Sequence, residues 1–180
     1  MPPTKMFVSD TPEMLLEAVQ NYGHALFSFL DDQKTHEICL AAVRENGCAF
    51  QWVPDDKRTK EVCLAAVGQN WHVLRVIPDA MKTSELCLAA VKMHGHALLY
   101  VPDTNKTSEL CLAAVKMHGH ALRYIPGKKQ TDEIVAAAIA QTPEAAQYED
   151  LRATAKRAIC RAAVRKGWPL GITRHIAKFL

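Results

Sequence analysis

The amino-acid sequence predicts an all-α fold, a right-handed α-solenoid of about seven helix pairs with a period of 24 residues. The first observation is that residues 83–98 return almost unchanged as residues 107–122, an offset of 24 residues. The second is a Thr-x-Glu phrase that recurs at the same offset along the chain. Its threonines are Thr11, Thr35, Thr59, Thr83, Thr107 and Thr131. A fixed period of this length is typical of stacked helical repeats.

The first element of each repeat is predicted to be an α-helix of roughly eleven residues. The threonine hydroxyl is expected to cap its first turn, and the glutamate two residues later lies near the positive end of the helix dipole. Apolar residues such as those of 86–91 cover more than half of the helical wheel. This pattern is typical of a helix that neighbours contact on several sides.

Glycine stands where each long helix is expected to end, at Gly23, Gly47, Gly95 and Gly119. A left-handed C-terminal cap favours glycine, so we expect that conformation at these positions. Trp71 replaces the glycine in one repeat, and we therefore expect the helix before it to end in a different way.

The second element of each repeat is predicted to be short, either an α or a 3-10 helix. Residues 96–101 are an example, and a proline follows them. We expect the short helix to end there, because Pro forces the residue before it out of the helical region. An acid then opens each loop (Asp31, Asp55, Asp79, Asp103) and a base closes it (Lys34, Arg58, Lys82, Lys106). We expect surface ion pairs here, each contributing about 0–1 kcal/mol.

The repeats predict a single domain over residues 1–180. Residues 1–10 lead in, 11–130 form five regular repeats, 131–154 form a sixth and weaker repeat, and 155–180 form a degenerate basic C-terminal cap. Residues 152–180 carry eight Lys or Arg and no acid. Because the net charge of the chain is +3, residues 1–151 carry a net charge of −5.

The composition predicts a soluble, cytoplasmic protein. Hydrophobic residues make up 49% of the chain, enough for a continuous core. No run approaches the roughly 20 apolar residues of a membrane helix, and the first residues lack the apolar region of a secretory signal. Location in a host cell is the alternative if the chain is secreted without a cleaved signal.

Four of the six cysteines share one position of the repeat: Cys39, Cys63, Cys87 and Cys111. Stacked helices lie roughly 8–10 Å apart, whereas a disulfide needs Cα atoms within about 7 Å. We therefore expect buried, reduced cysteines that act as small hydrophobic residues. Cys48 lies outside this series and is expected to be partly exposed.

Two further series resemble reactive sites. His94 with His96, and His118 with His120, could offer four imidazoles to a metal, but a glycine at a helix end should make each pair diverge. We therefore expect no metal and no other cofactor.

Glutamate opens every long helix, and identical environments cannot separate two carboxyl pKa values as acid–base catalysis requires. We expect no enzyme.

The last unit predicts a basic stripe because Arg157, Arg161 and Arg165 follow one another in four-residue steps, with Lys166 beside them. A solvated cap face is the simplest interpretation of this stripe. An acidic protein surface, nucleic acid and anionic lipid are the alternatives. The chain has no aromatic interleaving of the kind that single-strand binders use.

A second candidate surface lies on the short helices, where residues vary while the repeat stays fixed. The variable series is Phe27, Gln51, Arg75, Leu99 and Arg123, with Trp52, Tyr100 and Tyr124 beside it. Aromatic residues and arginine are favoured at the centres of protein interfaces.

The repeats resemble short helical repeats of bacterial proteins, and of some protist and giant-virus proteins, that are catalogued as a domain of unknown function. The shared features are the Thr-x-Glu-x-Cys-Leu-x-Ala-Val phrase, the glycine four residues later and the Tyr-x-Pro ending. The resemblance covers residues 11–126 well and 127–178 loosely. It implies an all-helical array and no catalytic residue, and members occur among proteins of intracellular bacteria that act on host cells. The architecture is also similar to leucine-rich-variant repeats.

These observations predict a non-enzymatic protein–protein interaction module, an effector or inhibitor that binds and modulates another protein. The alternative is a nucleic-acid-associated protein that uses the basic C-terminal helix. No interaction with a membrane is expected.

Overall fold

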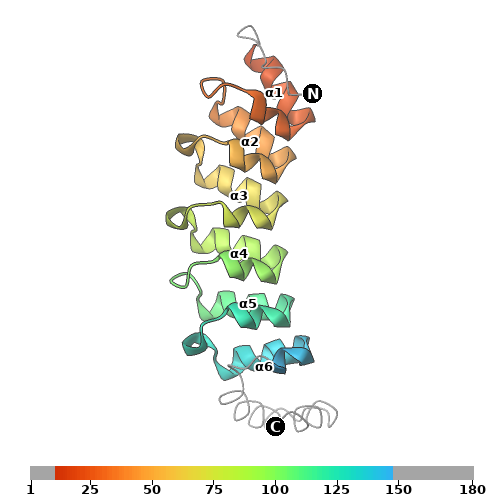
Figure 1. The fold of residues 1–180 in the computed structure, drawn as a ribbon, viewed down its shortest axis with the longest axis vertical. Helices are drawn as coiled ribbons and strands as arrows, with labels where there is room; N and C mark the ends of the chain where they lie inside the picture. The colour runs from red at the N-terminus through yellow and green to blue at the C-terminus, as the bar shows by residue number, and fades with distance from the viewer. Residues whose placement is uncertain (1–10, 148–180) are drawn as a thin grey trace. The chain divides into compact units, whose positions relative to one another are not determined.

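The computed structural model describes residues 11–147, and this part of the chain is all-α, with no strand. Long α-helices of ten residues alternate with short 3-10 helices (Figure 1). The long helices are α1 (Pro12–Asn21), α2 (His36–Glu45), α3 (Lys60–Gln69), α4 (Ser84–Met93), α5 (Ser108–Met117) and α6 (Asp132–Gln141). Among these residues, no helix combines the length and the apolar character needed to cross a membrane.

The second element of each repeat is a 3-10 helix of five or six residues, hereafter a short helix. The short helices are η1 (Gly23–Ser28), η2 (Gly47–Trp52), η4 (Trp71–Arg75), η6 (Gly95–Tyr100), η7 (Gly119–Tyr124) and η9 (Pro143–Gln147). Three-residue 3-10 turns occupy some of the loops: η3 (Asp55–Lys57), η5 (Asp79–Met81) and η8 (Gly127–Lys129).

The threonines cap the long helices as the sequence predicts. The side-chain oxygen of Thr35 accepts a hydrogen bond from the amide of Ile38 at 3.3 Å, and that of Thr107 accepts one from Leu110 at 3.2 Å. Thr11, Thr59, Thr83 and Thr131 make the same bond to the residue three positions later. Each cap satisfies one of the amides that a helix start leaves without a partner.

The predicted left-handed glycine caps are wrong. An extended residue ends each long helix instead, for example Asn46 with φ −142° and ψ 109°. The glycine that follows begins the short helix, and a Cβ at Gly47 would lie 2.5 Å from the carbonyl oxygen of Ala66 in the next repeat. Glycine is therefore required by a close approach between repeats, since any side chain would collide with that backbone.

The helix before Trp71 was also expected to end in a different way, and it does not. The residue that ends it, Asn70, is extended like its counterparts, with φ −149° and ψ 106°, and its amide donates to the carbonyl of Ala66. The change appears one element later, because η4 has five residues and its following residue, Val76, is in the right-handed helical region.

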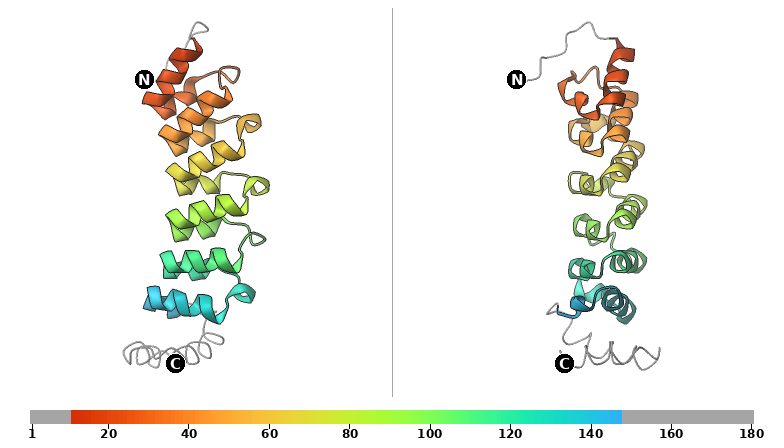
Figure 2. Two further views of the ribbon diagram at one scale, coloured as in Figure 1. Left: turned by 180° about the vertical axis from the view of Figure 1, so that it is seen from behind. Right: turned by 90° about the vertical axis from the view of Figure 1, so that its right-hand side faces the viewer.

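The chain divides into two compact units, Met1–Ala90 and Val91–Leu180. In the first, α1 packs against α2 and α2 against α3. η1 packs against α1 and α2, and η2 packs against α2 and α3. The long helices form one layer and the short helices a second layer beside it (Figure 2).

The second unit is built in the same way. α5 packs against α6, η6 packs against α5, and η7 packs against both long helices. The short helices η6 and η7 also contact each other. Both short helices therefore lie against the long helix of the next repeat, and η7 also lies against its own long helix.

The core of each unit lies between the two layers, and the cysteines belong to it. Cys39, Cys63, Cys87 and Cys111 are buried and free, as predicted, and Cys48 is exposed, also as predicted. Burial raises the pKa of Cys39 to about 11 and also raises the pKa values of Cys63 and Cys111. These thiols are protonated at neutral pH, which disfavours nucleophilic chemistry.

The predicted acid–base pairs form, but three of their four basic members are buried. Lys34, Lys82 and Lys106 are buried, while the acids that they contact remain exposed. The Lys106 ammonium donates to Asp103 at 2.9 Å and to the carbonyl oxygen of Tyr124 in the next repeat at 2.8 Å. In the second unit, Lys106 therefore links its own loop to the following short helix by hydrogen bonds.

Candidate functional site

In each unit, the strongest candidate surface is formed by the exposed side chains of the short helices and of the residues within two positions of either end, hereafter the short-helix face. Each short helix turns inward residues such as Leu74 and Leu98, which are fully buried. The next residue then points outward, because a 3-10 helix turns by about 120° per residue. The five outward residues Phe27, Gln51, Arg75, Leu99 and Arg123 are all exposed.

Exposed apolar residues are concentrated on this face. Eight large hydrophobic residues of the described chain are well exposed: Met14, Tyr22, Phe27, Leu30, Val76, Met93, Leu99 and Met117. All except Met14 lie on a short helix or within two residues of one. Single exposed apolar residues need no explanation, but a grouping of this kind is typical of an interaction surface.

The first unit carries an aromatic cluster on this face. The Trp52 ring lies 5.0 Å from the His24 ring and 5.6 Å from the Phe27 ring, centroid to centroid. Tyr22 lies 5.6 Å from His24 and is 64% exposed. Trp52 itself is half-buried between its neighbours. Of the predicted binding residues, Trp52 and Arg75 belong to this unit, and Arg75 is exposed.

The second unit carries the other described residues of the predicted site. Leu99 and Arg123 are exposed, and Tyr100 and Tyr124 are half-buried. The Arg123 guanidinium lies 5.4 Å from the centre of the Tyr124 ring, which favours a cation–π contact. The basic residues Arg157, Arg161, Arg165 and Lys166 lie outside the described residues.

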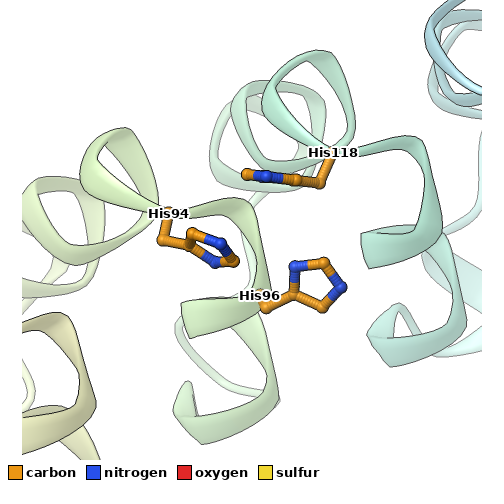
Figure 3. A group of neighbouring side chains, drawn as sticks. All are labelled: His94, His96 and His118. Atoms are coloured by element: carbon orange, nitrogen blue, oxygen red, sulfur yellow. The ribbon is translucent and has the colours of Figure 1, made fainter.

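Three histidines of the second unit form a cluster that the sequence did not predict. His94 and His118 are the residues that end α4 and α5, and His96 is the second residue of η6. Their rings gather in one place (Figure 3), and one nitrogen from each lies within 4.8 Å of the others. The predicted divergence of His94 and His96 is therefore wrong, since their ring centroids are 5.0 Å apart.

The convergence occurs where α4 gives way to η6. His94 is extended, with φ −154° and ψ 117°, and η6 begins at the next residue. His94 and His96 therefore flank the first residue of the short helix, and their ring centroids lie 5.0 Å apart. His118 joins them from the next repeat, at 4.2 Å from the His94 ring and 5.0 Å from the His96 ring.

The protonation of the cluster follows from its contacts. The Gly95 amide donates to Nδ1 of His118 at 3.2 Å, so a neutral His118 carries its proton on Nε2. Burial, together with the neighbouring His118 and His94, lowers the pKa of His96. The lower pKa favours the neutral form of His96.

A hydrogen bond joins the equivalent positions in the first unit. There the residue that ends one long helix donates to the second residue of the preceding short helix. Asn46 Nδ2 lies 3.0 Å from His24 Nδ1, and Asn70 Nδ2 donates to Cys48 Sγ at 3.1 Å. His118 and His96 occupy these positions in the second unit, yet His96 Nδ1 is buried and has no hydrogen-bond partner.

The glutamate series does not form a paired site in the described residues. These carboxylates are exposed, and two of them contact cations of the preceding repeat. Arg44 donates to Glu61 at 3.1 Å, and Lys60 contacts Glu85 at 2.5 Å. Exposed pairs of this kind contribute about 0–1 kcal/mol each.

The chain was compared with known proteins. Two consecutive segments, residues 35–82 and 83–129, match the family model described as Domain of unknown function (DUF4116). No curated protein and no solved structure matches the chain. The two matched segments each span two of the repeats described above and together cover more than half of the 180 residues. The chain therefore belongs to the DUF4116 family.

Proposed function

We propose that this chain is a non-enzymatic protein-binding module that uses its short-helix face. The observation that carries the proposal is the gathering of exposed apolar residues on that face, seven of the eight well-exposed large hydrophobic residues in the described chain. The aromatic cluster of the first unit and the Arg123–Tyr124 pair of the second provide the residue types that dominate binding energy at interfaces.

The proposed partner is a protein with an apolar and acidic surface. Arg75 and Arg123 are exposed on the face, and Lys92 and Lys116 are exposed at the ends of the long helices that precede η6 and η7. An acidic partner surface would be attracted to these charges and would associate faster at low salt. Binding at this face would modulate the partner's activity by covering its surface, as an effector or inhibitor does.

We also propose that the repeats continue as one right-handed α-solenoid of about seven units. In the first unit α2 packs against α1 and α3, and in the second α5 packs against α6, with the glycine-to-carbonyl approach recurring in both. A stack of this kind presents its short helices as one extended surface, which binds a large partner without a deep pocket.

The test is quantitative capture of partners by immobilised full-length protein. A face variant, Arg75→Glu with Arg123→Glu, is compared with a control of equal charge change, Lys60→Glu with Lys128→Glu. Proteins captured by the wild type and the control, and lost with the face variant, would support the proposal. Equal capture by all three proteins would contradict it.

An apolar pair of variants tests the same face without a change of charge. Phe27→Ser with Leu99→Ser should lose the same captured protein, whereas Met14→Ser, an equally exposed residue outside the face, should retain it. Retention of the chain on a DNA column, with no protein captured, would instead favour the nucleic-acid alternative. The basic C-terminal residues on which that alternative depends lie outside the described residues.

A further inference from the structure

We propose that His94, His96 and His118 form a binding site for a divalent first-row transition metal, with Zn²⁺ as the reference ion. Three imidazole nitrogens, one from each residue, lie within 4.8 Å of one another on the short-helix face of the second unit. All three side chains are half-buried, so solvent and a metal ion can reach them. The proposal goes beyond protein binding and does not depend on it.

The donor set favours this class of metal. The cluster offers imidazoles and neither thiolate nor carboxylate, and imidazole suits zinc, copper and nickel. Three protein ligands leave one tetrahedral position open for water or for a ligand from another molecule. Calcium and magnesium are disfavoured because they require oxygen ligands.

Metal binding requires the three imidazole nitrogens to move closer together than they are in this structure. A zinc ion binds imidazole nitrogen at about 2.0–2.1 Å, which places tetrahedral nitrogens about 3.4 Å apart. The three rings are held on residues at or beside helix ends, and each ring turns about two side-chain bonds. The proposal requires that rotation about these bonds bring the nitrogens together from their present separation of up to 4.8 Å. His118 ligates through Nδ1 once it releases the Gly95 amide.

His96 supplies the strongest single argument. Its Nδ1 is buried and lacks a hydrogen-bond partner, although the equivalent nitrogen of His24 receives a hydrogen bond from Asn46. In the second unit His118 stands in place of the asparagine, its Nδ1 accepts from the Gly95 amide, and no group donates to His96 Nδ1. A metal ion would satisfy His96 Nδ1 directly and would take His118 Nδ1 in exchange for the Gly95 amide.

The first experiment is a competition titration of the full-length protein against a chromophoric zinc chelator. The wild type should bind one Zn²⁺ per chain. His96→Ala and His118→Ala should each weaken binding by about tenfold or more. His120→Ala and His72→Ala, which occupy the same repeat position as His96 and lie outside the cluster, should change it by less than about twofold. Equal weakening by all four substitutions, or none by His96→Ala and His118→Ala, would overturn the proposal.

A second experiment uses the wild type alone and so does not depend on the folding of any variant. Paramagnetic Cu²⁺ is added to isotope-labelled protein, and amide signals are followed by NMR. Signals of Gly95, Ala97 and Gly119 should broaden at the lowest copper concentrations. Earlier broadening around His24 or His72, or uniform broadening along the chain, would show that the three imidazoles do not form the site.

Discussion

At the scale of single residues, the repeat depends on glycines that leave no space for a side chain. A Cβ added to Gly119 would lie 2.4 Å from the carbonyl oxygen of Ala138 and 2.7 Å from the side chain of Thr142. The carbonyl belongs to helix backbone, so it cannot move without shifting the long helix. The glycine therefore sets how closely a short helix approaches the next repeat.

The first prediction is that Gly119→Ala lowers the free energy of unfolding by about 1–3 kcal/mol, because the added methyl group overpacks a backbone contact. The control is Gly68→Ala within α3, where a Cβ would meet nothing within 4 Å. That substitution should raise stability by about 0.5–1 kcal/mol, since alanine favours helix. Chemical denaturation measures both, and a Gly119→Ala protein as stable as the wild type would contradict the close approach.

The buried thiols predict a loss of stability in alkali. Burial raises the pKa of Cys39 from 9.0 to about 11, so at about pH 10 the folded thiol keeps its proton while the unfolded thiol has lost it. Stability is therefore complete below about pH 9 and falls as the pH rises toward 11. Cys39 contributes about 1 kcal/mol to this fall per pH unit.

Denaturation at about pH 8 and about pH 10 tests this prediction. The wild type should lose more stability between the two pH values than Cys39→Ala does, because alanine does not titrate. The difference in stability loss between the two proteins reports the Cys39 thiol alone, because the tyrosines and lysines that titrate in this range are the same in both. Parallel losses in the two proteins would mean that Cys39 does not titrate differently on folding.

At the scale of elements, a buried lysine joins a loop to the following short helix. Lys106 donates to the Tyr124 carbonyl oxygen and to Asp103, and its main-chain oxygen in turn accepts from Lys129 at 3.0 Å. The aliphatic part of such a side chain packs among apolar groups while the ammonium finds oxygen acceptors. Surface ion pairs were expected in these loops. Lys34, Lys82 and Lys106 are buried instead, and only their acidic partners are exposed.

Lys106→Met tests the contribution of this hydrogen bond between the loop and the short helix. Methionine keeps most of the apolar contact but removes the donor, so the Tyr124 carbonyl loses its bond to the ammonium. The free energy of unfolding should fall by about 1–3 kcal/mol. Lys128→Met, at an exposed position of the next loop, is the control and should change stability by less than about 0.5 kcal/mol. Equal effects of the two substitutions in a thermal melt would contradict the role of Lys106.

The elements themselves could be predicted from the sequence, whereas several contacts between repeats could not. The 24-residue period located the threonine caps and the buried cysteines because both are local to one repeat. The glycines were misinterpreted because a left-handed cap and a close approach require the same residue type. The burial of Lys106 and the meeting of His96 with His118 depend on the neighbouring repeat, so no pattern within one repeat reports them.

In the candidate site, too, features within one repeat could be predicted and contacts between repeats could not. The exposed series of Phe27, Arg75, Leu99 and Arg123 could be predicted because the short-helix pattern fixes which residues point outward. The aromatic cluster added His24 to the predicted residues, and the imidazole cluster was missed. One signal was available: the residue that ends a long helix and the second residue of the short helix recur at the 24-residue period and face each other across repeats.

At the scale of the whole molecule, one set of contacts recurs in both units. Glycine meets a helix carbonyl, long helix packs on long helix, and short helices pack against the long helix of the next repeat. If the same contacts continue through the chain, each repeat advances the stack by about one helix spacing, roughly 8–10 Å.

Small-angle X-ray scattering of the full-length protein tests this account most directly. A compact domain of 180 residues has a radius of gyration of about 16 Å. The proposed solenoid predicts about 20 Å or more, with a distance distribution that has a long tail, because the repeats advance in one direction. A radius of gyration near 16 Å with a symmetric distance distribution would contradict the stack and the extended binding face proposed from it.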